Sequence, residues 1–186
     1  CATTTPLTNT PPEITPLPDY RIPLGTAFVL AGTATDPDAG DILTYAWEQI
    51  DDGVVSNTNF GPENAAGSNF RSLRPTVDSL RYFPRLSRVI TGDLTQTNPE
   101  TGSAWETVAT VEREFNFALT VRDNAAGGGQ LNSDLVKVVV EEEAGPFRVL
   151  SQGTPQSYSM GSVQSVNWDV AQTDGGPINS QLVDIY

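Results

Sequence analysis

The segment at residues 114–122 alternates between large apolar residues and smaller or polar ones. Its apolar members are Phe115, Phe117, Leu119 and Val121. A period of two places all four side chains on one face of a β-strand, and that face must then be buried. This segment therefore constrains the fold more than any other: it requires a sheet with an apolar layer packed against it.

Shorter segments of the same character occur elsewhere in the chain. They lie at residues 13–15, 20–23, 27–33, 43–49 and 134–140. Gly, Pro and Asp separate them, as expected for turns between strands. No helical period competes over the chain as a whole. The pattern predicts an all-β fold, a β-sandwich over residues 13–143.

The composition of the chain changes along its length, and this predicts its organisation. Residues 1–12 are rich in Thr and Pro and are expected to form an extended linker. Residues 51–104 are too long for an ordinary strand connection and are interpreted as an ordered insertion lying on the sandwich. An acidic run and a Gly-Pro pair precede residues 147–186, which are predicted to begin a second β-sandwich of a longer protein.

The charge of the chain argues against several partners. Asp and Glu number 23 and Lys and Arg number 10, so the net charge is −13. A chain this acidic repels nucleic acid and anionic lipid and attracts cations. Because no run of about 18 apolar residues occurs, no transmembrane segment is expected either.

The chain contains no histidine. Zinc sites of the HExxH type, Ser-His-Asp triads and Cys-His dyads are therefore excluded within these residues, and we expect neither enzymatic activity nor zinc binding. Asp51 and Asp52 are a carboxylate pair, but adjacent loop residues give no reason for the separation that glycoside hydrolysis requires.

Cys1 is the only cysteine, so no internal disulfide can form. Three interpretations are open: a lipid-modified first residue of a bacterial lipoprotein, half of a disulfide to another part of the protein, or an accident of where the sequence begins.

A cluster of carboxylates precedes the strand predicted at residues 43–49. Asp36, Asp38 and Asp41 fall within a span of six residues that is predicted to form a turn containing Gly40. Their carboxylate oxygens suit a hard cation such as calcium. Three Asp do not complete a calcium sphere, so Asp123 and Asn124 are predicted as further ligands. Asn9 and Glu13 are candidates from the linker. The alternative is an ordinary polar hairpin loop.

Residues 51–104 carry five of the ten basic residues: Arg71, Arg74, Arg81, Arg85 and Arg88. They could form an anion or glycan patch, or they could pair with the surplus carboxylates. Of the three tryptophans, Trp47 and Trp168 are expected in apolar cores, whereas Trp105 follows a loop and is a candidate for sugar stacking.

Several motifs together resemble a known family. They are Asn9-Thr10-Pro11-Pro12, residues 34–49 (ATDPDAGDILTYAWEQ), residues 119–124 (LTVRDN), Phe70-Arg71-Ser72, Arg81-Tyr82-Phe83-Pro84, Gly145-Pro146-Phe147 and residues 166–170 (VNWDV). They are similar to cadherin-like and polycystic-kidney-disease-type Ig-like repeats of bacterial secreted proteins. More narrowly, they resemble the region downstream of the catalytic domain in secreted bacterial reprolysin-like zinc metallopeptidases.

The resemblance implies an Ig-like or cadherin-like accessory module, secreted or on the cell surface, whose partner is the catalytic domain of the same polypeptide. The zinc site of such a parent would lie outside this chain. Members of that family often carry Cys at the position of Ala46, bonded near the linker, and here Cys1 has no such partner. An adhesion module of a surface lipoprotein, binding glycan or protein through residues 51–104, is the alternative.

Overall fold

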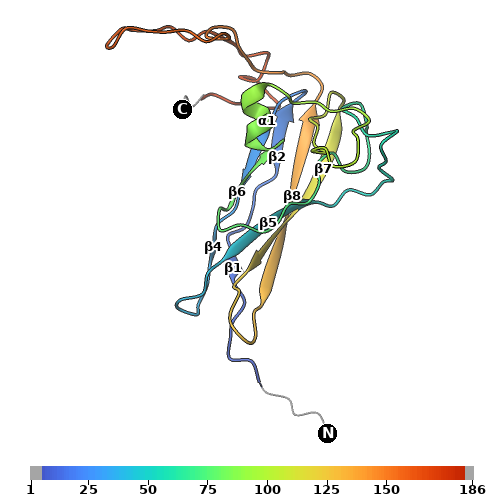
Figure 1. The fold of residues 1–186 in the computed structure, drawn as a ribbon, viewed down its shortest axis with the longest axis vertical. Coiled ribbons are helices and arrows are strands. Elements are labelled where there is room, and N and C mark those ends of the chain that lie inside the picture. The colour runs from blue at the N-terminus through green and yellow to red at the C-terminus, as the bar shows by residue number, and fades with distance from the viewer. Residues whose placement is uncertain (1–5, 183–186) are drawn as a thin grey trace.

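A computed structural model describes residues 6–182, in which the regular secondary structure is almost entirely β-strand, with one short helix (Figure 1). The strands are β1 (Glu13–Ile14), β2 (Tyr20–Pro23), β3 (Phe28–Ala31), β4 (Ala34–Thr35), β5 (Thr44–Gln49), β6 (Leu80–Phe83), β7 (Arg113–Arg122), β8 (Leu131–Glu141), β9 (Arg148–Val149) and β10 (Trp168–Asp169). The helix α1 spans Leu86–Thr91. The prediction of a β-rich fold is confirmed.

The largest sheet has four strands in the order β2-β8-β7-β5. The long strands β7 and β8 pair antiparallel, with Phe115 opposite Val138 and Phe117 opposite Val136. Their register keeps the apolar faces of both strands on the same side of the sheet. β2 joins the edge of β8 in parallel.

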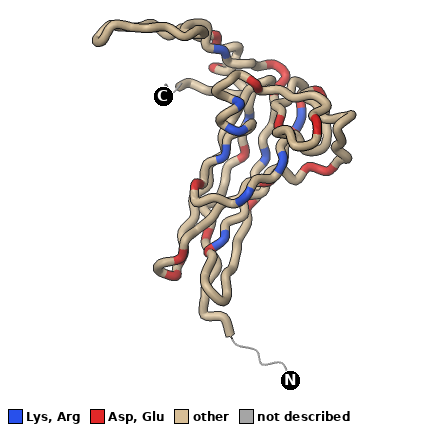
Figure 2. Tube along the Cα trace, viewed as in Figure 1, with Lys and Arg blue, Asp and Glu red and all other residues tan. Residues whose placement is uncertain are grey.

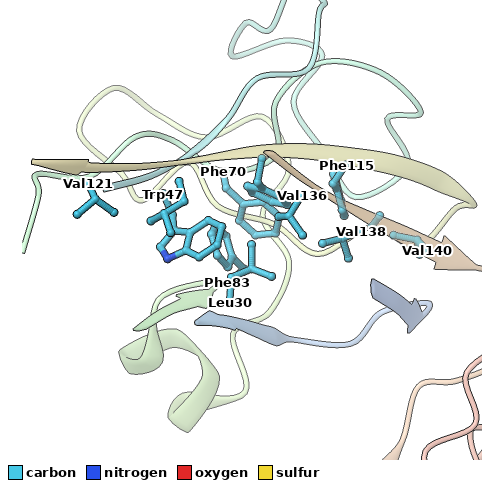
Figure 3. Close-up of a cluster of buried hydrophobic side chains, with 12 residues drawn as sticks. Leu30, Trp47, Phe70, Phe83, Phe115, Val121, Val136, Val138 and Val140 are labelled. Carbon is cyan, nitrogen blue, oxygen red and sulfur yellow. The ribbon is translucent and has the colours of Figure 1, made fainter. Parts of the chain in front are cut away.

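A second sheet, β3 paired antiparallel with β6, contributes to the same core. Leu30 from β3 and Phe83 from β6 lie with Trp47, the apolar faces of β7 and β8, and Phe70 in one buried cluster (Figure 3). Phe70 and Phe83 meet edge to face, with ring centroids 5.1 Å apart. Phe115 and Phe117 are fully buried, as the alternation of residues 114–122 predicts.

The first strand region is divided between two sheets. β1 pairs antiparallel with β4, and β2 then pairs with β8. The chain passes from the first sheet to the second at Pro16 and Pro18, which donate no backbone hydrogen bond. Between them, Leu17 N donates to Asp134 Oδ2 at 3.1 Å. Proline here ends one ladder and allows the chain to move to the other.

The interpretation of residues 51–104 as an insertion lying on the sandwich is incomplete, because this stretch contains β6, a strand of the core, and helix α1. Alternation in β6 is short and interrupted by Arg81, which hides it in the sequence. The helix has no buried residue and ends at Gly92, whose φ of 71° is left-handed. The rest of the stretch consists of loops that we call the excursion, residues 51–79 and 92–104.

Residues 147–186 contain less regular structure than predicted. Of the three strands expected there, two are present as two-residue strands, β9 and β10, paired with each other. The third, at residues 181–186, lies mostly outside the described residues. Within the described range, no helix is long and apolar enough to cross a membrane.

Candidate metal site

The turn between β4 and β5 brings three predicted ligands together. Oxygens of Asp36, Asp38 and Asp41 all lie within 4.8 Å of one another, and all three side chains are half-buried. Asp36 Oδ1 accepts a hydrogen bond from Asp38 N at 2.8 Å, which closes the turn locally. Acidic residues gather at this projecting turn in Figure 2.

Two oxygens of this cluster are buried without a partner. Within residues 6–182, Asp36 Oδ2 and Asp41 Oδ2 accept no hydrogen bond. Burial raises the pKa of Asp41 above its usual value, and repulsion from Asp36, Asp123 and Asp38 raises it further. Mutual repulsion of this kind is relieved either by protonation or by a cation.

Asp123 follows β7 and is completely buried beside the turn. Its Oδ1 accepts from Ala125 N at 3.1 Å and Gln130 N at 2.8 Å, and its Oδ2 accepts from Asn9 Nδ2 at 2.6 Å. Burial alone raises the pKa of Asp123, but these hydrogen bonds outweigh it, so the pKa lies below its usual value. Asp123 is not a member of the 4.8 Å group.

Asn124 fixes the strand that leaves the turn. Its Nδ2 donates to Ile42 O at 2.7 Å and to Thr44 Oγ1 at 3.0 Å. Its φ of 58° is left-handed, a conformation that Asn tolerates better than most residues. The amide therefore positions the residues after Asp41 and directs its donors, rather than its oxygen, toward them.

The end of the linker bonds to the acidic turn and to Asp123. Thr10 N donates to Asp38 Oδ2 at 2.6 Å, next to the contact of Asn9 with Asp123. Gln130 Nε2 donates to Asn9 O. Glu13, also a candidate, is exposed and paired with Thr35 in the β1–β4 ladder. Thr10 thus contacts the turn and Asn9 contacts the neighbouring Asp123, whereas Glu13 lies in the β1–β4 ladder.

This arrangement offers oxygens to a hard cation and offers no group for proton transfer by an imidazole or thiol. Three carboxylates within 4.8 Å of one another supply part of the set of six to eight oxygens that calcium takes, and calcium mixes its ligand types flexibly. Beside the turn, the bonds of Asn9 with Asp123 and with Gln130 join residues more than 100 positions apart. No sequence pattern could have indicated them.

Other predicted sites have structural uses. Trp47 is buried, and its indole donates to Ser79 O at 3.0 Å. The expectation that Trp168 is buried is wrong: it is 39% exposed, because β9 and β10 form only a short hairpin with little to cover it. Asp51 accepts from Asn116 Nδ2 at 2.7 Å and from Gln49 Nε2, so it braces the main sheet.

Three arginines of residues 51–104 pair with carboxylates. Arg85 Nε contacts Glu106 Oε2 at 2.9 Å, Arg81 lies 3.5 Å from Glu106 Oε1, and Arg88 contacts Asp93 at 2.8 Å. Glu106 is fully buried, and no pattern around it in the sequence indicates this role.

Searches with this chain found no matching family model, no matching curated protein and no matching solved structure.

Proposed function

We propose that this chain is a non-catalytic, extracellular spacer module of a larger secreted bacterial protein, stabilised by calcium at the β4–β5 turn. The observation that carries the proposal is the pair of buried, unpartnered oxygens Asp36 Oδ2 and Asp41 Oδ2. Like charges placed so close destabilise the turn unless a cation lies between them. Calcium suits such a site because it accepts irregular sets of six to eight oxygens.

The proposed module is an Ig-like or cadherin-like β-sandwich. Two features support this assignment: the β3–β6 sheet and the four-stranded sheet share one apolar core, and the first strand region divides between β4 and β8. A calcium ion at the turn would also hold the incoming linker, since Thr10 already bonds to Asp38. Such a site would stiffen the junction between this module and whatever precedes it.

The parent protein that we propose is a zinc metallopeptidase, with its catalytic domain as the partner of this module. The family resemblance supports this, and a chain without histidine would leave zinc binding to that domain. The chain by itself should not cleave casein under conditions in which a metallopeptidase does. Proteolysis that withstands further purification and is abolished by zinc chelation would contradict the assignment.

The calcium proposal is tested by thermal unfolding with calcium and with a chelator. We expect the melting temperature of the wild-type chain to rise in calcium by several degrees, which corresponds to about 1–2 kcal/mol. Asp41→Asn removes one of the repelling charges and is nearly isosteric. It should therefore lose the calcium response and melt no lower than the wild type in chelator.

The matched control is Asp52→Asn, an exposed carboxylate outside the turn. This variant should keep the full calcium response. A wild-type melting temperature that is the same in calcium and in chelator would end the calcium proposal, and the turn would then be an ordinary polar loop.

A second candidate function is binding of an extracellular glycan or protein by a surface lipoprotein. A pocket in the excursion, beside Trp105, favours it.

A further inference from the structure

A pocket of about 450 Å³ lies among three loops of the excursion and its return to the core. Its lining residues come from three separate segments: Val55 and Phe60, Ser68 and Arg71, and Thr101 with Trp105. This volume lies within the range of pockets that bind small ligands. The pocket is remote from the acidic turn, since the loops that line it lie toward the opposite end of the molecule (Figure 1).

The backbone of this pocket is fixed from several sides. Gln49 Oε1 accepts from Asn69 N at 2.8 Å and Phe70 N at 3.0 Å, which holds the segment before Arg71. Arg71 O accepts from Arg81 Nη2 at 2.6 Å. Loops held in this way lose little freedom when a ligand binds.

Trp105 has an unusual backbone conformation for a bulky residue. Its φ is 55°, in the left-handed region that large side chains rarely adopt. Trp105 N donates to Gln96 Oε1 at 2.8 Å, and Trp105 O accepts from Arg71 N at 3.3 Å, so the surrounding structure maintains this conformation. The indole packs edge-on against Phe60, with centroids 5.3 Å apart, and remains half-buried at the pocket. Strain of this kind gathers at binding sites.

Three polar side chains that line the pocket with the indole, those of Arg71, Ser68 and Thr101, form no ion pair or hydrogen bond with the described residues. Across residues 6–182, the guanidinium of Arg71 forms no ion pair within 4 Å, although carboxylates outnumber basic residues more than two to one. Arg81, Arg85 and Arg88 all have acidic partners. The hydroxyls of Ser68 and Thr101 likewise form no hydrogen bond in that range. A cation and two hydroxyls therefore lie beside an aromatic ring with no internal use.

We propose that this pocket binds an acidic sugar, a hexuronate residue of an extracellular polysaccharide. The apolar C–H face of the sugar ring would stack on Trp105, as sugar rings do on aromatic side chains. The sugar carboxylate would pair with the planar guanidinium of Arg71, which matches carboxylates in a bidentate manner. Ser68 and Thr101 would bond ring hydroxyls. This inference rests on the second candidate function, glycan binding, and is independent of the calcium site.

The net charge of −13 sets a condition on this binding. An anionic polymer is repelled by the molecule as a whole, while Arg71 attracts the carboxylate at short range. Salt near 0.15 M screens beyond roughly 8 Å, so it suppresses the repulsion more than the direct pair. Binding of long uronate chains should therefore strengthen, rather than weaken, between very low and physiological salt.

The test is calorimetric titration of the full chain with trisaccharides of galacturonate, glucuronate and mannuronate at physiological salt. Neutral trisaccharides of galactose, glucose and mannose serve as comparison ligands. We expect one uronate to bind at least tenfold more tightly than its neutral counterpart. Arg71→Gln should erase that difference. Trp105→Asn should weaken binding of either ligand at least tenfold, because Asn keeps the left-handed backbone but lacks the ring.

Arg74→Gln is the matched control, since Arg74 is also exposed and unpaired within the described chain but lies outside the pocket. It should bind like the wild type. Equal affinity for acidic and neutral sugars would overturn the proposal, as would a wild-type affinity in a folded Trp105→Asn variant. Absence of binding by all three uronates at about 5 mM, where millimolar affinities are detectable, would also overturn it.

Discussion

Asp123 is a buried carboxylate whose charge is stabilised by hydrogen bonds. Asn9, Ala125 and Gln130 all donate to it. Each of these bonds favours the ionised form, which explains the lowered pKa. Asp123 therefore joins the linker, the end of β7 and the start of β8.

The pKa of Asp123 predicts a loss of stability in acid. Because the folded-state pKa lies below the ordinary value of 3.8, its contribution is present above that value and is lost as the pH falls through the folded pKa. Asp123→Asn should lower stability at neutral pH, since its amide would face N–H donors. It should also reduce the loss of stability that the wild type shows as the pH falls, which we call the acid limb. Urea unfolding across the acid range measures both effects.

The neighbouring Asp41 contributes with the opposite sign. Its raised pKa means that destabilisation appears as the pH rises above 3.8 and is complete above the folded pKa.

The control for the Asp123 prediction is Asp52→Asn, whose acid limb should match that of the wild type. An Asp123→Asn variant with an unchanged acid limb would show that the hydrogen bonds to Asp123 contribute little.

At the scale of elements, β6 depends on a buried charge network. Arg81 leaves β6 to donate to Trp47 O and to approach Glu106, and its guanidinium lies 4.5 Å from the Phe83 ring centroid. Burial lowers the pKa of Arg81 to about 10, although Glu106 opposes the shift. The guanidinium thus remains charged at neutral pH and depends on Glu106.

Glu106→Gln should destabilise the protein by about 3 kcal/mol, because it leaves Arg81 buried without its counter-charge. Chemical unfolding at neutral pH measures this loss. The comparison is Glu114→Gln, whose partner Lys137 is 44% exposed; breaking this solvent-screened surface pair should have a much smaller effect. Equal effects of the two substitutions would contradict the role given to burial.

The sequence predicted some elements better than others for identifiable reasons. β7 is long and its large apolar residues recur at every second position, and β8 carries Val136, Val138 and Val140 on one face, so the buried faces of both strands could be assigned from the sequence. β6 has four residues and includes a buried arginine, which disguises its core face. The short helix α1 buries no side chain and so leaves no apolar period.

The candidate sites divide in the same way. Asp36, Asp38 and Asp41 are close in sequence, so a local turn is sufficient to bring them together. The bonds of Asp123 to Asn9, and the pocket made by segments around Phe60, Arg71 and Trp105, depend on tertiary contacts. Residue type alone indicates such side chains as candidates, but only the fold shows which of them are in contact.

At the scale of the whole molecule, the C-terminal part differs from the core. Every residue from Gln152 to Ser165 is exposed, including Met160 and Val163. This hairpin extends away from the rest of the chain (Figure 1). Local opening costs little where few apolar contacts must be broken.

Hydrogen exchange followed by mass spectrometry should therefore show two classes of amide. Amides of residues 152–165 should exchange at nearly intrinsic rates, whereas those of β7 should exchange only by global unfolding. The internal control is β8, which should behave like β7 because the two strands share ten residue pairs. Strong protection within the hairpin would mean that it packs against something in solution.

The parallel pairing of β2 with β8 has a mechanical consequence. The chain enters at one end of the molecule, and β8 delivers it to the other end (Figure 1). A tensile force between the two ends would pull β2 and β8 in opposite directions along their length. Their hydrogen bonds would then be loaded in shear and would have to fail together rather than one after another. Among the described strands, this short pair of Tyr20–Pro23 with the end of β8 is the one that would determine how much tension the module withstands before it unravels.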